Sequence, residues 1–175
     1  PSDLAPMRDL AVRAGAQEDA ASAELLRRAC LGAAEAYPVL GGYAASRVHA
    51  AWLDLRRADY DPAVWARLDG GRRRTADELK AAAAVRQRVS EAFQTLFNRH
   101  HFIALPATAG PAVGKAACDD AHRTRLLALN APGSLAGLPA IAAPARRADG
   151  RTVGVQFLFR DMANFGWTSV LDRLG

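Results

Sequence analysis

Residues 126–157 have the sequence LLALNAPGSLAGLPAIAAPARRADGRTVGVQF, and this stretch decides the fold of the second half of the chain. Asp149-Gly150 stands between two apolar runs, which favours a tight turn because these residue types tolerate the positive φ that the turn requires. The pattern predicts a β-hairpin with strands at 140–145 and 152–159. Both faces of the second strand are mostly apolar, so we expect both faces to be covered.

The segment upstream of the hairpin, residues 130–139, carries prolines and glycines at short intervals. It is too apolar for an exposed linker, and its prolines and glycines interrupt a continuous helix or strand. We predict a turn at 130–132, a single helical turn at 134–138, and a break at Pro139 before the buried strand. Small residues in such a stretch allow the backbone to pass close to neighbouring segments.

The first half of the chain, residues 1–99, has the apolar spacing of helices. Apolar residues recur every three or four positions over 20–36. Pro38 and the glycines after it end this pattern, and a second helical stretch covers 43–55. Asp61-Pro62 opens a short third helix, because proline is favoured in the first turn.

The clearest helix start is at Thr75. Thr75 and Glu78 have the spacing of a capping box, in which each side chain satisfies a free backbone N–H of the first turn. The apolar residues that follow predict a helix over 75–98.

The second half, residues 100–175, has short apolar runs separated by prolines and glycines. The expected fold class is therefore α/β: a helical first half, then a short mixed sheet with a hairpin covered by helices. Besides the hairpin, we predict a strand at 102–105, a short helix or turn at 119–129, and a closing helix at 163–174.

Composition and charge exclude several classes of function. The 175 residues correspond to about one domain, and no apolar run reaches the roughly 18–20 residues of a membrane span. Cys30 and Cys118 lie too far apart for a disulfide framework or a zinc site, so we expect a reducing cytoplasm and no metal. The net charge of +5 suggests nucleic acid, but the arginines are scattered among acids. Because the one cluster, Arg72-Arg73-Arg74, has no aromatic residue within it, we expect no nucleic-acid partner.

The candidate catalytic motifs are weak. GPAVGK at 110–115 lacks the glycine spacing and the hydroxyl residue of a phosphate-binding loop. The four histidines have no metal-ligand spacing, and Asp119-Asp120 are adjacent side chains that point apart. Ser134 lies at the start of the predicted helical turn, where the role of N-cap is favoured over that of nucleophile because no convincing base accompanies it.

Three segments together resemble the amidase signature enzymes. These are the stretch at 126–157 quoted above, FIALPATAGPA at 102–112, and ADYDPAVWARLDGGRRRTADELKAAAAVRQRV at 58–89, in the family's order. The resemblance implies a larger α/β fold, with a mixed sheet covered by helices. It also implies amide hydrolysis through a serine acyl-enzyme, without a metal or cofactor. In the family a second serine and a lysine activate the nucleophile, and a Gly/Ser-rich loop forms the oxyanion hole.

The chain departs from the family pattern in its catalytic residues. The family's catalytic serines lie in a Gly/Ser-rich signature far upstream of these motifs, and neither Lys80 nor Lys115 matches the catalytic lysine. No catalytic residue is therefore carried over. The resemblance carries over only a substrate-pocket wall: Ala107 and Thr108 from the loop after the first strand, and Asn130, Ser134 and Leu135 from the turn before the hairpin.

These observations favour the C-terminal fragment of an amidase, inactive alone, whose partner is the missing N-terminal portion or an equivalent subunit. The whole enzyme would act on a small amide. An alternative is a non-catalytic module for binding or subunit pairing, and a third hypothesis is a small hydrolase that uses Ser134. As a fragment, the chain is expected to self-associate through the Val153/Phe157 or Gly154/Leu158 face of the hairpin.

Overall fold

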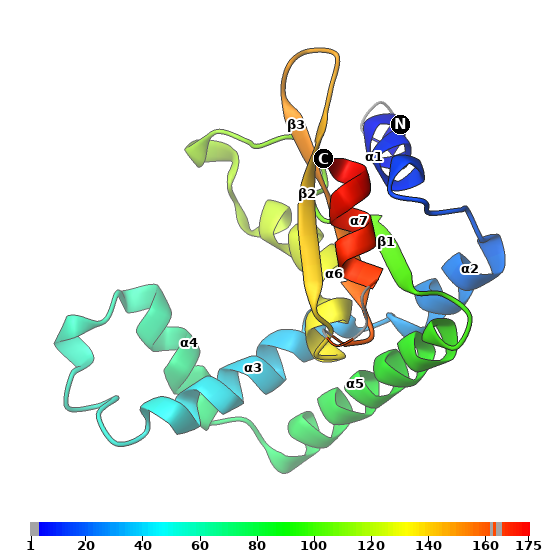
Figure 1. Ribbon diagram of the computed structural model, residues 1–175. Helices are drawn as coiled ribbons and strands as arrows, with labels where there is room; N and C mark the ends of the chain where they lie inside the picture. The colour runs from blue at the N-terminus through cyan, green and yellow to red at the C-terminus, as the bar shows by residue number, and fades with distance from the viewer. Residues whose placement is uncertain (1–3, 162, 164–165) are drawn as a thin grey trace.

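A computed structural model describes residues 4–161, 163 and 166–175, and Figure 1 shows a small sheet with helices on both sides and an arm of two helices. The predicted fold class, a helical first half followed by a sheet with a hairpin, is confirmed. The helices are α1 (Leu4–Arg13), α2 (Ala20–Ala29), α3 (Ala33–His49), α4 (Pro62–Arg72), α5 (Ala76–Phe97), α6 (Asp120–Leu135) and α7 (Gly166–Leu174), with short 3₁₀ turns η1 (Arg57–Asp59) and η2 (Lys115–Ala117). The strands are β1 (Phe102–Pro106), β2 (Ala140–Arg146) and β3 (Thr152–Phe159).

The sheet has the strand order β1-β3-β2, so the hairpin's second strand lies in the centre. The predicted hairpin is confirmed: Ala145 is paired with Val153, and Gly150 has a φ of 81° at the turn. The first strand, predicted at 102–105, pairs with β3 so that Phe102 faces Phe159. We expected a mixed sheet, but both pairings among the described strands are antiparallel.

Both faces of β3 are buried. On one face, Val153, Phe157 and their neighbours pack against α1 and α7. On the other, Leu158 packs against residues of α2, α3, α5 and α6. The expectation that one of these faces would drive self-association is therefore wrong, because Val153, Phe157 and Leu158 are at most 2% exposed.

The α5 helix begins as predicted. Thr75 Oγ1 accepts a hydrogen bond from the Glu78 N–H at 3.2 Å, and the Glu78 carboxylate accepts one from the Thr75 N–H at 2.8 Å. Val89, Phe93 and Leu96 then form a fully buried stripe on one side of the helix. This stripe fixes α5 against the central core.

The predicted helix over 20–36 is divided in two. The α2 helix ends at Ala29, and Gly32 adopts the left-handed φ of 80° that allows the chain to turn into α3. The prediction that Pro38 ends a helix is wrong, because Pro38 lies inside α3. The buried residues Ala33 and Ala36 anchor this part of α3 in the core, so packing outweighs the hydrogen bond that proline removes. The α3 helix ends at His49, whereas the second helical stretch was predicted to continue to residue 55.

Two further predictions are also wrong: a turn at 130–132 and a separate helical turn at 134–138. The α6 helix continues through Pro132 to Leu135, with Ala131 to Gly133 buried. It ends in a Schellman motif, in which Gly137 has a φ of 67° and the Leu138 N–H donates to the Gly133 carbonyl at 3.0 Å. The 119–129 segment is thus the first part of this helix.

The closing helix α7 begins at Gly166, later than the predicted start at 163. Of the residues predicted to begin this helix, 164 and 165 lie outside those that the structure describes. No helix among the described residues is long and apolar enough to cross a membrane.

Candidate functional site

Three uncharged polar side chains meet where β1 ends. Thr108 lies in the loop after β1, Asn130 on α6 and Gln156 on β3. We call these three residues the β1-loop junction. Each forms hydrogen bonds with backbone groups of another segment, so the junction fixes the loop at 106–108 relative to α6 and β3.

Gln156 lies at the centre of the junction and is only 5% exposed. Its side-chain amide donates to the carbonyl oxygens of Pro106 and Leu129, each at 2.9 Å. The side chain points from β3 toward α6 because it alternates with Val155 and Phe157, which face the opposite core. One buried amide in the middle of β3 therefore joins this strand to the end of β1 and to α6.

Asn130 makes a second connection between α6 and the loop. Its amide nitrogen donates to the Ala107 carbonyl oxygen at 2.9 Å and to the Leu126 carbonyl oxygen, one turn earlier on α6, at 2.8 Å. The location of Asn130 within a helix rather than in a turn makes this geometry rigid. Ala107 and Asn130, two of the expected pocket-wall residues, are in direct contact.

Thr108 and Gly154 make the third connection. The Gly154 N–H donates to Thr108 Oγ1 at 2.8 Å, and the Ala107 N–H donates to the Gly154 carbonyl at 2.8 Å. A Cβ at Gly154 would lie 3.1 Å from the Thr108 methyl carbon and 3.2 Å from the Ala107 Cβ. The glycine thus allows the loop to lie directly against β3.

Ser134 and Leu135 do not join the junction. Leu135 is buried in the helical core, and Ser134 is exposed in the last turn of α6. The predicted N-cap role of Ser134 is wrong, because the last turn of a helix has free carbonyl groups rather than free N–H groups. Ser134 therefore has no free backbone N–H groups beside it.

Ser22, Asp19 and His100 form another polar cluster, with the residue types of a serine hydrolase triad. Ser22 Oγ donates to an Asp19 carboxylate oxygen at 2.6 Å and lies 3.5 Å from His100 Nε2. The same Nε2 is 3.6 Å from the Asp19 carboxylate, whereas in a triad the acid binds the other ring nitrogen. Asp19 also accepts hydrogen bonds from the N–H groups of Ala21 and Ser22, and these bonds identify it as the N-cap of α2. The Ser22 hydroxyl bond in particular lowers the pKa of Asp19.

The other reactive residue types are dispersed. Burial raises the pKa of the Cys30 thiol, which disfavours the reactive thiolate. Within the ranges that the structure describes, no three His, Cys, Asp or Glu side chains gather into a group that could hold a metal ion.

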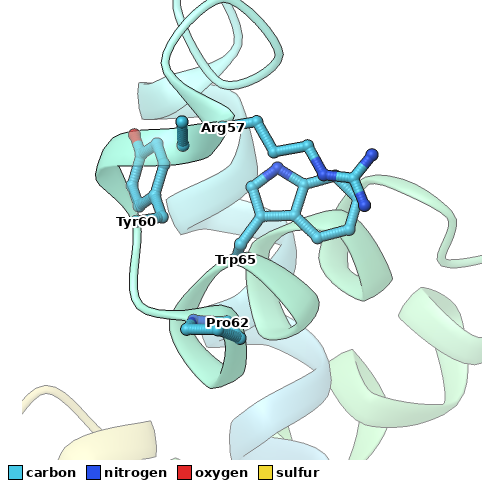
Figure 2. Close-up of a pocket in the computed structure, with 5 residues that line it drawn as sticks. Arg57, Tyr60, Pro62 and Trp65 are labelled. Atoms are coloured by element: carbon cyan, nitrogen blue, oxygen red, sulfur yellow. The ribbon is translucent and has the colours of Figure 1, made fainter.

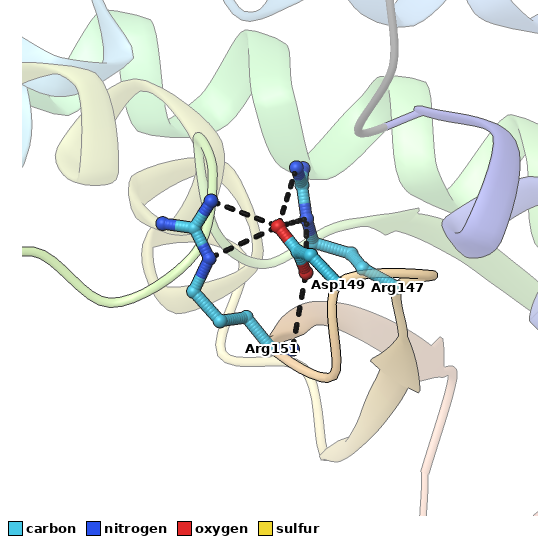
Figure 3. A network of polar contacts seen from close by, with 3 residues as sticks. All are labelled: Arg147, Asp149 and Arg151. Atoms are coloured by element: carbon cyan, nitrogen blue, oxygen red, sulfur yellow. Dashed lines mark hydrogen bonds and ion pairs between the residues drawn. The ribbon is translucent and has the colours of Figure 1, made fainter.

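A charge cluster lies at the hairpin turn and contains none of the junction residues. Asp149 accepts hydrogen bonds from the side chains of both Arg147 and Arg151, at 2.8 to 3.2 Å (Figure 3). These arginines hold the pKa of Asp149 far below its usual range. Because the Arg151 N–H also donates to the Asp149 carboxylate at 3.1 Å, the cluster stabilises the turn.

The family model described as Amidase matches residues 15–163, most of the chain, including the junction. The chain belongs to the Amidase family. Its fold is similar to a solved structure of a vestigial protein complex that reveals the evolutionary origins of an s-triazine catabolic enzyme, with a TM-score of 0.73 and 22% identity over 99% of this chain and 39% of that chain. It is also similar to a crystal structure of an amidase, with a TM-score of 0.69 and 24% identity over 83% of this chain and 35% of that chain.

A further similar structure is allophanate hydrolase from Kluyveromyces lactis, with a TM-score of 0.66 and 17% identity over 99% of this chain and 29% of that chain. These identities are low, so the likeness establishes an amidase signature fold and nothing finer. This amidase-family chain spans about two fifths, or less, of the length of these structures. The chain has no significant match among curated proteins.

Sequence reasoning missed Gln156 and Gly154 as members of the site in this amidase-family chain. The available signal was a single amide side chain in an otherwise apolar strand. A buried polar residue in such a strand requires hydrogen-bond partners, and these come from residues distant in sequence.

Proposed function

We propose that this chain forms the C-terminal part of an amidase whose catalytic serines and lysine come from a region outside these residues. The observation that carries the proposal is the β1-loop junction, which holds the loop at 106–108 rigidly against α6 and β3. The junction contains a hydroxyl and two amides, and none of these supplies a nucleophile with its base. Its chemistry suits a wall that orients a substrate beside a reactive centre.

The large solvent-exposed surface area of the chain supports the proposal that it contacts a further region of the enzyme. The chain exposes 10,999 Å². A compact monomer of 18.6 kDa exposes about 8,200 Å². Moreover, β1 and β2 are outer strands of the described sheet, and alternate residues of β2 such as Ala142 and Pro144 are exposed. In the proposed enzyme, these surfaces contact the catalytic portion.

The proposed substrate is a small amide. The names of similar structures include an allophanate hydrolase, an aryl acylamidase and a 6-aminohexanoate cyclic dimer hydrolase. In the proposed assembly, Ala107, Thr108 and Asn130 form one wall of the substrate pocket. Ser134 and Leu135 are not part of this wall, because Ser134 is exposed in the last turn of α6 and Leu135 is buried in the helical core. We place the assembly in the cytoplasm, in keeping with the free thiols of Cys30 and Cys118.

A non-catalytic pairing module is the second candidate. It is favoured by the burial of both faces of β3, because the described part of the chain forms a core of its own. Such a module would bind a separate subunit without contributing to a substrate pocket.

A fluorophosphonate probe and the upstream reading frame test the proposal together. The chain alone should show no stoichiometric labelling, since its junction lacks a nucleophile, and labelling at Ser134 would establish the small-hydrolase hypothesis instead. The reading frame before Pro1 should encode a lysine and a Gly/Ser-rich segment. A start codon immediately upstream, with no such coding sequence before it, would favour the pairing module.

A further inference from the structure

The end of the helical arm exposes several large apolar side chains. The arm consists of the last part of α3, the turns after it, η1 and α4, and it projects from the body of the molecule (Figure 1). Val48, Trp52 and Leu55 are 67%, 40% and 87% exposed. Large apolar side chains exposed within one short segment are typical of an interaction surface.

An open hollow lies at the end of this arm. It has a volume of about 600 Å³ and is lined by Arg57, Ala58, Tyr60, Pro62 and Trp65. Figure 2 shows the rings of Tyr60, Pro62 and Trp65 around it, with Arg57 extending across the Trp65 ring. The Arg57 guanidinium carbon is 4.2 Å from the centroid of that ring. The hollow therefore combines flat apolar walls with one positive charge at its rim.

The hollow is held in shape by its own side chains. His49 Nδ1 and the Tyr60 hydroxyl oxygen are 2.6 Å apart, which fixes the Tyr60 ring against the end of α3. Asp61 caps α4 by accepting hydrogen bonds from the N–H groups of Ala63 and Val64, which fixes the start of the helix that carries Trp65.

At the hollow, one buried donor lacks a hydrogen-bond acceptor, and one arginine that stacks on an aromatic ring lacks an ion pair. The indole N–H of Trp65 is buried and has no hydrogen-bond acceptor within the described part of the chain. Buried N–H groups nearly always have a partner, so this donor calls for an acceptor from another molecule. Arg57 forms no ion pair at salt-bridge distance with any described carboxylate. Asp54, which is close in sequence, is bound by Arg72 instead.

We propose that this hollow is a docking site for an acidic segment of a partner protein. The segment inserts an apolar side chain between Tyr60, Pro62 and Trp65. A carboxylate beside that side chain binds the Arg57 guanidinium and, after a small shift of Arg57, accepts the Trp65 N–H. This interaction goes beyond the proposed amidase role and does not depend on it.

Charge and shape favour this occupant over two others. A second copy bound about a two-fold axis here would bring the two Arg57 side chains together, and like charges in an interface are unfavourable. A membrane surface would bind the protruding side chains of Val48, Trp52 and Leu55, whereas the hollow receives a side chain from a partner.

Fluorescence anisotropy with a labelled peptide tests the docking site. The probe alternates leucine and glutamate around one phenylalanine, and its matched counterpart carries lysine in place of every glutamate. We expect saturable binding of the acidic peptide and at least about tenfold weaker binding of the lysine peptide. Arg57→Gln and Trp65→Phe should each weaken the acidic peptide by about five- to tenfold. Trp65→Phe retains an aromatic ring and removes the donor.

Arg86→Gln is the control, since it makes the same charge change at an exposed position of α5, and its affinity should stay within about twofold of the unmodified protein. Circular dichroism establishes that each variant is folded. If Arg57→Gln alters the fold, the two peptides still decide the question on the unmodified protein. Equal binding of both peptides, or no binding of either, overturns the proposal. It is also overturned if Arg57→Gln abolishes binding to phosphatidylglycerol vesicles, or dimerisation in sedimentation velocity, while the acidic peptide does not bind.

Discussion

The side-chain amide of Gln156 donates a 2.9 Å hydrogen bond to the Leu129 carbonyl oxygen, and this bond joins the central strand β3 to α6. The same nitrogen donates at 2.9 Å to the carbonyl oxygen of Pro106, at the end of β1. Since Gln156 is 5% exposed, water cannot readily replace these bonds. The position of the β1 loop therefore depends on this side chain, together with the bonds that Asn130 and Gly154 make to the same loop.

Replacement of Gln156 by leucine tests this dependence. Gln156→Leu keeps a similar volume and removes the donor from two carbonyl oxygens, so we expect the free energy of unfolding to fall by about 2 kcal/mol. Urea unfolding measures the change. Gln87→Leu is the control, because Gln87 is exposed on α5 and bonds only to Glu91, and its effect should stay within about 0.5 kcal/mol. Equal losses in both variants would contradict the role of the junction.

The close crossing of α3 and α4 gives a second prediction. A Cβ on Gly71 would lie 2.1 Å from the Gly42 carbonyl oxygen, so Gly71→Ala must push the two helices apart. We expect faster amide hydrogen exchange throughout α4 and a loss of about 2 kcal/mol or more. Gly70→Ala is the matched control, since a Cβ there meets nothing within 4 Å. It should stabilise α4 by about 0.5 to 1 kcal/mol through helix propensity. Unchanged exchange in Gly71→Ala would mean that the arm adapts without cost.

Short-range signals in the sequence predicted the elements that local chemistry controls. Asp149-Gly150 located the hairpin because glycine tolerates the positive φ that the turn requires, and Gly150 adopts a φ of 81°. Thr75 and Glu78 located the start of α5 because a capping box needs only two residues at fixed spacing.

Predictions from the sequence were wrong where tertiary packing outweighs the local conformational preference of a residue. Proline inside a helix costs about 3 kcal/mol, which is why a turn was predicted at Pro132. Ala131, Pro132, Gly133 and Leu135 are all buried, and full burial of one leucine side chain contributes about 1.5 to 3 kcal/mol. The sum of such contributions keeps α6 continuous. The role of Gln156 was missed for a related reason, since its two acceptors lie 50 and 27 positions away in sequence and no spacing rule connects them.

The charge cluster at the hairpin turn predicts a response to pH. Arg147 and Arg151 hold the pKa of Asp149 well below its usual range (Figure 3). Because the pKa is lower in the folded than in the unfolded state, the carboxylate's contribution to stability is complete above about pH 4. It is lost as the pH falls through the lower folded-state value. We expect Arg151→Gln to raise the pKa of Asp149 toward the ordinary value, measured by the NMR shift of its carboxyl carbon. Arg146→Gln should leave this pKa unchanged, and an equal rise in both variants would show a general field effect instead.

The last prediction concerns the proposed pocket wall in the assembled amidase. Asn130→Leu removes the hydrogen bond to the Ala107 carbonyl and releases the loop that carries Thr108. We expect kcat/KM for the enzyme's amide substrate to fall by about tenfold or more, because small displacements of positioning groups are costly. The change should fall mainly on KM, since Asn130 would orient substrate rather than act on the reacting atoms. Thr124→Ala, at an exposed position of the same helix, should leave kcat/KM within about twofold. If Asn130→Leu lowers the unfolding midpoint but leaves kcat/KM unchanged, the junction supports the fold alone and the loop does not face the substrate.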